Sequence, residues 1–263
     1  MSIVSKATVA TIGLASKLFL NCGYCSSVKV DGIHHLLNEL GRKDGSGVIT
    51  VANHLSTLDD PVMWGILPAA TYFDSKATRW SMGAADICFT NPVLSAFFRN
   101  GQVIETFRGK GIWQPAVDLA IEKVNNGGWV HLFGEGKVCQ THTYDSHSGV
   151  AELRRFKWGV GRIITEAKSH PTVIPVWLTG FDQLMPLGRK FPFNYLPRAG
   201  ADLSITFGKP IPVEELLEAA NSKDSSEDVI RSKLTAVVKN RVELLGRSVS
   251  GLMLGQTQAP RPL

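Results

Sequence analysis

Short β-rich runs alternate with helical patterns along most of this chain, and this alternation constrains the fold more than any other feature. The expected strands are residues 47–53, 102–106, 129–133, 172–180 and 202–211. The expected helices begin near residue 60 or cover residues 91–100, 113–128, 158–168, 213–221 and 225–245. Such alternation is typical of a mostly parallel central sheet covered by helices, in which reactive loops gather beyond the carboxyl ends of the strands. The sequence therefore predicts one α/β domain.

The composition fits a folded protein of this size. The chain has 263 residues, 44% of them hydrophobic, and shows no repeat, low-complexity tract or linker, so one domain can absorb it. The formal net charge is +5 without a run of lysine or arginine, which argues against a nucleic-acid partner and favours a basic face for anionic lipid or phosphate. The four cysteines, with a lone CxxC at Cys22 and Cys25, match no zinc-site pattern, so we expect reduced thiols and no metal.

An apolar segment lies near the N-terminus, at residues 7–25. Lys17 and Asn21 interrupt it, so it falls short of the ~18 uninterrupted apolar residues of a spanning helix. The large apolar residues that can share one broad helical face are Val9, Ile12, Leu14, Leu18 and Phe19. This pattern favours a helix in a membrane interface, with Leu14, Leu18 and Phe19 inserted and Lys17 near the headgroups. A helix packed on the core of the domain and a cleaved targeting segment remain alternatives.

A histidine and two carboxylates follow the first strong strand, in the stretch NHLSTLDDP. On a continuous helix His54 and Asp59 would lie about 140° apart, so their side chains meet only if residues 55–58 form a turn. The Ser-Thr sequence favours that turn, as does a helix start with Asp60 as N-cap and Pro61 as first residue. A carboxylate on one imidazole nitrogen fixes the tautomer and makes the other nitrogen a general base. The alternative is an exposed histidine beside two helix-capping aspartates.

Three further blocks lie at or near the ends of expected strands. Arg108 follows residues 102–106, where a guanidinium can grip a phosphate in a bidentate manner. The Gly-Glu-Gly-Lys sequence at 134–137 lets backbone N–H groups approach an anion, with Glu135 and Lys137 supplying opposite charges. Pro175 lies inside an apolar strand and indicates an edge or a bend near a pocket. Each block has a plain alternative, such as a solvated arginine or a Glu135–Lys137 ion pair.

Taken in this order, the blocks resemble the glycerophospholipid acyltransferase superfamily, whose members show His-x4-Asp, Gly…Arg, Phe-Pro-Glu-Gly and an apolar block with proline. The match extends further over residues 30–212, which are similar to the tafazzin family within that superfamily. The segments that carry this resemblance are NHLSTLDDPVMWGIL, RWSMGAADICFTN, FFRNGQ, NNGGWVHLFGEGKV, RFKWGVGRII and FGKPI. The double aspartate, AADICF and RFKWG-x-GR are the most specific of them.

The resemblance implies a phospholipid–lysophospholipid transacylase that needs neither coenzyme A nor another cofactor. Its implied partners are cardiolipin, monolysocardiolipin, phosphatidylcholine and the membrane surface, with cardiolipin remodelling at mitochondrial membranes, peripheral and facing the intermembrane space. His54 would be the general base and Asp59 its orienting partner, while Arg108, Glu135 and Gly136 would face the glycerophosphate. The basic block Arg154, Arg155, Lys157 and Arg162 would contact headgroups or hold the fold. The resemblance leaves open whether the chain forms a homo-oligomer.

The expected domain boundaries are a membrane-associating segment at 1–28, an acyltransferase domain at 29–246 and a flexible tail at 247–263. One departure is Gly134, which stands where the family has proline and frees a loop that proline would stiffen. Two other functions therefore stay open. An acyl-CoA-dependent lysophospholipid acyltransferase would use the same His54 and Asp59, and a non-catalytic lipid-binding or lipid-transfer protein would need neither.

Overall fold

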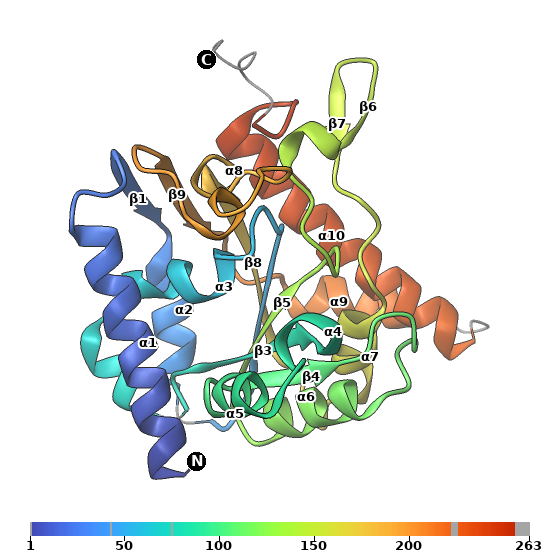
Figure 1. The fold of residues 1–263 in the computed structure, drawn as a ribbon. Helices are drawn as coiled ribbons and strands as arrows, with labels where there is room; N and C mark the ends of the chain where they lie inside the picture. The colour runs from blue at the N-terminus through green and yellow to red at the C-terminus, as the bar shows by residue number, and fades with distance from the viewer. Residues whose placement is uncertain (1, 43, 75, 222–225, 256–263) are drawn as a thin grey trace.

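A seven-stranded sheet with helices on both faces forms the centre of the computed structural model, which describes residues 2–42, 44–74, 76–221 and 226–255 (Figure 1). Its strands are β1 (Ser27–Asp31), β2 (Val48–Ala52), β3 (Arg79–Ala84), β4 (Val103–Thr106), β5 (Trp129–Phe133), β8 (Thr172–Thr179) and β9 (Asp202–Phe207). Their order across the sheet is β1-β9-β8-β2-β5-β3-β4. The five strands from β8 to β4 are parallel, which confirms the expected mostly parallel sheet.

The other two strands run in the opposite direction. β9 pairs with β8 in antiparallel register, with Val176 opposite Phe207, and β1 is parallel to β9. The chain between β8 and β9 contains only the short helix α8 (Phe181–Leu184) and a 3-10 turn at Phe193–Tyr195. Because this connection has no crossover helix, β9 starts at the edge where β8 ends and must return antiparallel.

The helices match the expected pattern in their main positions. They are α1 (Ile3–Asn21), α2 (Ile33–Leu40), α3 (Asp59–Met63), α4 (Ala85–Cys88), α5 (Pro92–Asn100), α6 (Pro115–Asn125), α7 (Gly159–Glu166), α9 (Val213–Ala220) and α10 (Glu227–Ser250). Shorter 3-10 helices cover Trp64–Ile66, Ala69–Phe73 and Thr141–Thr143, and a hairpin joins β6 (Asp145–His147) to β7 (Val150–Glu152). The expected tail from residue 247 begins inside α10, and residues 256–263 lie outside the described part of the chain.

Two apolar cores lie on opposite faces of the sheet because successive side chains of a strand point in opposite directions. In β2, Ile49 and Val51 join the core under α6, α7 and α10, while Val48 and Ala52 join the core under α2 and α3. β8 alternates in the same way, so every residue from 173 to 178 is buried. Parallel strands covered on both faces have continuous apolar sequences, and this is why β2 and β8 could be predicted from the sequence.

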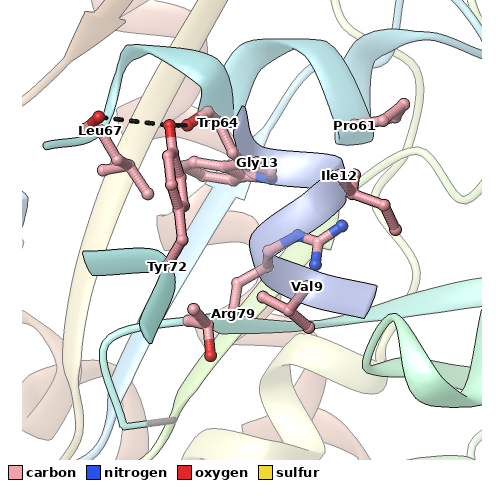
Figure 2. A pocket seen from close by; sticks show the side chains of 9 residues that line it. Val9, Ile12, Gly13, Pro61, Trp64, Leu67, Tyr72 and Arg79 are labelled. Atoms are coloured by element: carbon pink, nitrogen blue, oxygen red, sulfur yellow. Dashed lines mark hydrogen bonds between the residues drawn. The ribbon is translucent and has the colours of Figure 1, made fainter. Parts of the chain in front are cut away.

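The N-terminal helix α1 packs on the second of these layers through small residues. Its buried residues are Ser5, Val9, Ala10, Gly13, Ser16 and Leu20. A Cβ on Gly13 would lie 2.5 Å from the Tyr72 ring, and one on Gly65 would lie 2.6 Å from the Ser16 carbonyl carbon, so the backbones approach closely. Figure 2 shows the small cavity beside this contact, where the Tyr72 hydroxyl donates hydrogen bonds to the carbonyls of Trp64 and Leu67.

The outward side of α1 carries apolar residues that are left exposed by the part of the chain that the structure describes. Ile3, Val4, Leu14 and Leu18 are exposed, Leu18 to 70%. On length and composition, α1 is long and apolar enough to cross a membrane. Lys17 is half-buried, and its ammonium group donates to the carbonyl of Gly65, while its expected position near headgroups stays a prediction. Phe19 is half-buried and packs against Tyr24, so the outward face is narrower than the sequence suggested.

Candidate active site

The turn after β2 brings His54 and Asp59 together. His54 Nδ1 lies 2.8 Å from Asp59 Oδ2, so residues 55–58 form the turn that this pairing requires. In a neutral imidazole, a carboxylate beside Nδ1 favours the tautomer with the proton on Nδ1, and Nε2 is then the acceptor. The His54 side chain is 18% exposed, and within the described residues no hydrogen bond to its Nε2 is formed. Nε2 is therefore the basic atom that a substrate can reach.

Asp59 is held by four hydrogen bonds and is fully buried. Its Oδ2 accepts from the backbone N–H groups of Leu55 (2.6 Å) and Ser56 (2.9 Å) as well as from His54. Its Oδ1 accepts from the Ser56 hydroxyl at 2.7 Å. Hydrogen bonds to the charged form offset the cost of burying a carboxylate. The Asp59 side chain is thereby fixed in one position, and with it the orientation of the imidazole.

The His54 ring packs against aromatic side chains of β5. The imidazole stacks on Phe133, the last residue of β5, with ring centroids 4.0 Å apart and an angle of 15° between the planes. Phe133 in turn meets the buried His131 edge to face at 4.6 Å. His131 is bonded through Nδ1 to Thr50, and burial lowers its pKa to about 3, so it is neutral at physiological pH. This stack leaves His54 little freedom to rotate.

Glu135 lies beside the same turn, two residues past the end of β5. Its Oε2 accepts from the backbone N–H of His54 at 3.4 Å, which is a long contact, and the side chain is buried. Burial raises the pKa of the Glu135 carboxyl to about 7, well above its ordinary value of 4.5. The chain that follows Glu135 makes a second contact with the His54 turn, because Cys139 N–H donates to the His54 carbonyl at 2.7 Å. Of the four side chains that the sequence predicts for the site, His54, Asp59 and Glu135 are thus brought together.

Gly134 occupies a position where a larger residue does not fit without movement. Its N–H donates to the Ala52 carbonyl at 3.0 Å and extends the β2–β5 ladder by one bond. Proline would remove this donor. A Cβ at position 134 would also lie 2.3 Å from the Phe156 ring. Next to it, Gly136 has φ +69°, a left-handed conformation that glycine adopts without strain.

The second aspartate of the motif does not cap α3, and the expectation that it does was wrong. The helix begins at Asp59, and Asp60 instead forms a partly buried ion pair with Arg79 from β3. Asp60 also accepts from Trp64 Nε1 and Ser81 Oγ, and Arg79 donates to the Gly101 carbonyl. Burial opposes the charge of Asp60, but Arg79 outweighs it and lowers the pKa of the carboxyl. The pair joins the start of α3 to β3 and to the end of α5.

Arg108 lies at the same edge of the sheet but farther along it. It follows β4, which β5 and β3 separate from β2, so it lies about three strand spacings, or ~14 Å, from the end of β2. Its guanidinium forms a bidentate pair with Asp86, and both side chains are exposed. The pairing with Asp86 gave no signal in the sequence, because the two residues follow different strands. That Arg108 shares a cleft with His54 stays a prediction.

Sequence comparison identifies the family of the chain. The profile of the Acyltransferase family matches residues 27–179. The chain is 34% identical to "Tafazzin" of Drosophila melanogaster over 89% of its own length and 58% of that protein. It is also 34% identical to "Taffazin" of Dictyostelium discoideum, over 81% of its own length and 72% of that protein. The chain belongs to the tafazzin family of acyltransferases.

Two further relatives of this tafazzin-family chain bear on its function and fold. It is 37% identical to "N-acylphosphatidylethanolamine synthase" of Arabidopsis thaliana, over 71% of its own length and 64% of that protein. Its fold is similar to that of the 1-acyl-sn-glycerophosphate acyltransferase of Thermotoga maritima, with a TM-score of 0.56 and 23% identity. That match covers 91% of this chain and 79% of the other, and it confirms the expected fold class. The chain spans little more than half of the fly relative.

The basic block of the tafazzin family has separate roles here. Arg162 is buried and pairs with Asp118 and Glu166, so it holds α6 and α7 together. Arg154 donates to the Thr143 carbonyl, and Lys157 N–H donates to the Gly134 carbonyl, which brings this segment against the Glu135 loop. Of the two roles expected for the block, Arg162 therefore performs the structural one.

Three side chains that could attack an ester, Ser56, Cys88 and Cys139, are not activated as nucleophiles. The Ser56 hydroxyl is buried and donates to Asp59, so it does not point toward a substrate. Burial raises the pKa of the Cys139 thiol to about 11, and burial together with Asp60 and Asp86 raises the pKa of Cys88. A thiol attacks as its thiolate, so both thiols are poor nucleophiles at neutral pH.

Proposed function

We propose that this tafazzin-family chain transfers fatty acyl chains directly between phospholipids and lysophospholipids, without coenzyme A, and that it remodels cardiolipin. The observation that carries the proposal is the free Nε2 of a histidine fixed by a buried carboxylate. The tafazzins among its relatives support the substrate class. Donor and acceptor are both glycerophospholipids, so the reaction is near equilibrium and requires no energy source.

The proposed mechanism uses His54 as base and then as acid. Nε2 takes the proton from the free hydroxyl of a lysophospholipid, and that oxygen attacks the acyl ester carbonyl of a donor phospholipid. The tetrahedral intermediate breaks its bond to the original glycerol oxygen, which takes the proton back from Nε2. Asp59 stabilises the imidazolium that exists between these two transfers. The products are one new phospholipid and one new lysophospholipid.

The test is transfer of a labelled acyl chain between purified phosphatidylcholine and monolysocardiolipin with coenzyme A absent. We expect transfer by the parent chain and at least a ~100-fold loss in His54→Ala, the usual effect of removing a general base. His170→Ala, on the exposed surface, is the matched control and should keep the parent rate. A chain that transfers only from acyl-CoA would instead be an acyl-CoA-dependent lysophospholipid acyltransferase. Lipid exchange that His54→Ala leaves unchanged would identify a non-catalytic lipid-transfer protein.

A second candidate is acyl transfer to an amine. The 37% identity to an N-acylphosphatidylethanolamine synthase supports it, because the same histidine could remove a proton from the ethanolamine nitrogen as it attacks. The same assay distinguishes the two when phosphatidylethanolamine replaces the lysophospholipid as acceptor. An N-acylated product that resists mild alkaline hydrolysis would favour the amine reaction, whereas label confined to esters would favour the first proposal.

The proposed reaction requires contact with a bilayer, since both substrates are membrane lipids. We infer that α1 lies along the membrane interface with Leu14 and Leu18 inserted, which the exposed apolar side of this helix supports. We also propose a mitochondrial location, peripheral and facing the intermembrane space, which the resemblance to the tafazzin family implies. Protease accessibility tests this location: the chain should be protected in intact mitochondria and digested once the outer membrane is ruptured.

A further inference from the structure

The loop at residues 186–198, between β8 and β9, presents large apolar side chains to the outside. Phe191, Phe193 and Tyr195 expose 81%, 61% and 73% of their surfaces, and Leu187 and Leu196 are each about half exposed. Exposing three neighbouring aromatic side chains to water is unfavourable, and a lipid or protein surface that covered them would remove this cost. This loop was not among the features that the sequence pattern singled out.

The charges of the 186–198 loop are all positive. It contains Arg189, Lys190 and Arg198, and no aspartate or glutamate occurs between Asp182 and Asp202. Arg189 fastens the loop to itself, since its guanidinium donates to the carbonyls of Leu196 and Pro186. Lys190 and Arg198 are exposed beside the aromatic side chains. Aromatic residues flanked by lysine and arginine are typical of segments that lie at a membrane–water interface.

The loop lies at the edge of the sheet that carries His54. It follows β8, which is parallel to β2 and adjacent to it, so both strands end at this edge. One buried side chain joins the two regions: the Gln140 amide donates to the carbonyls of Leu55 and Met185 and accepts from the N–H of Leu187. Leu55 immediately follows His54. The Gln140 side chain therefore bridges the start of the 186–198 loop and the turn that carries His54.

The end of the loop contacts the segment that follows α1. The Tyr24 hydroxyl donates to the Pro197 carbonyl at 2.6 Å, and Gly200 N–H donates to the Tyr24 carbonyl at 2.9 Å. Leu18, exposed on the last turns of α1, is six residues before Tyr24. Figure 1 shows the C-terminal end of α1 at the same end of the molecule as α8, which immediately precedes the loop.

We propose that the 186–198 loop docks on the surface of an anionic phospholipid bilayer, with Phe191, Phe193 and Tyr195 among the headgroups. The positive charge of the loop favours an anionic bilayer over a neutral one. The Gln140 contacts hold the docked loop against the turn that carries His54, so the bilayer meets the chain beside the basic nitrogen. This second step rests on the proposed transfer reaction, whereas the docking itself does not.

Sedimentation with vesicles tests the docking. The probes are vesicles of phosphatidylcholine alone and of phosphatidylcholine mixed with phosphatidylglycerol. Phe191→Ser/Phe193→Ser/Tyr195→Ser should bind the anionic vesicles at least tenfold more weakly than the parent. Lys190→Gln/Arg198→Gln should lose most of the preference for anionic vesicles. The control Val229→Ser/Val249→Ser removes two residues of α10 that are each 41% exposed and should bind like the parent.

Parent-like binding by the folded triple variant would overturn the proposal, as would an undiminished anionic preference in Lys190→Gln/Arg198→Gln. Thermal unfolding shows whether each variant is folded. Removing exposed side chains should shift the midpoint little, since they make few contacts within the domain.

Acyl transfer tests the link to the site. Each variant is assayed on vesicle lipids and on dihexanoyl lipids kept below their critical micelle concentration. The ratio of vesicle transfer to monomer transfer should fall at least tenfold in the triple variant and stay unchanged in the α10 control. An unchanged ratio would show that the loop does not bring the bilayer to the site. A parent chain that transfers neither form of lipid would refute the proposed function, while the sedimentation result would still decide the docking.

Discussion

The turn that carries His54 and the outward surface formed by α1 and the 186–198 loop are built in opposite ways. In the turn, Asp59 is fully buried and each of its oxygens accepts a hydrogen bond from the protein. On the outward surface, Leu18 and Phe191 are large apolar side chains that the domain leaves uncovered. On the proposed function, the turn supplies the geometry of the reaction and the outward surface meets the membrane that holds the substrate. Substitutions in the two regions should therefore change different measurements.

Asp59→Asn should have the largest effect, on the rate of acyl transfer. The amide oxygen can keep the bonds from His54, Leu55 and Ser56, and the Ser56 hydroxyl can turn to accept from the amide nitrogen. The fold should therefore survive, but a neutral amide stabilises the imidazolium far less than a carboxylate does. We expect a loss of at least ~100-fold in coenzyme A-free transfer, by analogy with other histidine–aspartate pairs.

Ser56→Ala provides the matched control for Asp59→Asn. It removes a buried hydroxyl that touches the same carboxylate but leaves the His54–Asp59 contact in place. We expect a loss of stability of about 1–2 kcal/mol and less than a ~10-fold change in rate. Equal losses of rate in the two variants would show that any disturbance of the turn is enough, and that the charge of Asp59 has no special role.

Glu135→Gln should change the pH dependence of stability. Burial raises the pKa of this carboxyl to about 7, so between pH 4.5 and 7 the folded chain holds a proton that the unfolded chain has lost. The stabilisation from this extra bound proton is complete below pH 4.5. It is lost progressively as the pH rises from 4.5 through 7. From pH 4.5 to 7.5 the parent should lose about 2–3 kcal/mol more of its unfolding free energy than Glu135→Gln does. Urea titrations across this range measure the difference.

The control for this experiment is Glu152→Gln, on the exposed part of the β6–β7 hairpin, which should follow the parent curve. If Glu135→Gln also followed the parent curve, the carboxyl would not titrate near neutral pH in the folded chain. The proximity of Glu135 to His54 would then have a purely structural meaning.

Leu14→Ser/Leu18→Ser should have the smallest effect of these substitutions, and it should change membrane binding alone. Both side chains face outward, so stability should change by less than about 0.5 kcal/mol. Sedimentation with anionic vesicles should weaken about fivefold to tenfold, since two partly inserted leucines contribute roughly 1 kcal/mol or slightly more. Leu20→Ser, on the buried side of the same helix, should instead lower stability and serves as the contrast. Unchanged sedimentation of the folded double variant would exclude α1 from the membrane contact.

The sequence predicted the parts of the molecule that depend on local pattern. Spacing and turn chemistry favoured a turn that pairs His54 with Asp59, which the structure forms, and the apolar runs of β2 and β8 predicted central parallel strands. Pairings between distant elements gave no such signal. Asp60 meets Arg79, 19 residues away on β3, and β3 itself, with the sequence RWSMGA, contains no β-branched residue.

The prediction for α1 failed in part for a related reason. The sequence pattern predicts one face of large apolar residues, with Val9 and Phe19 beside Leu14 and Leu18. In the structure, Val9 is buried with glycine, alanine and serine neighbours, and Phe19 packs on Tyr24. Hydropathy does not reveal which side of an apolar helix a neighbouring backbone approaches, because small residues permit close packing whatever their polarity.

The glycine contacts between α1 and the domain have a consequence for a helix with the domain on one side and lipid on the other. Gly13 lies against Tyr72, and Gly65 lies against the backbone of Ser16 and Lys17, so much of the attachment is dispersion between closely spaced atoms. Attraction of this kind works between helices in lipid, where no water is released, as well as in an aqueous domain. The joint would therefore hold its strength if the outer side of α1 exchanged water for acyl chains. A helix attached by large apolar side chains alone would lose that advantage, because lipid would solvate those side chains equally well.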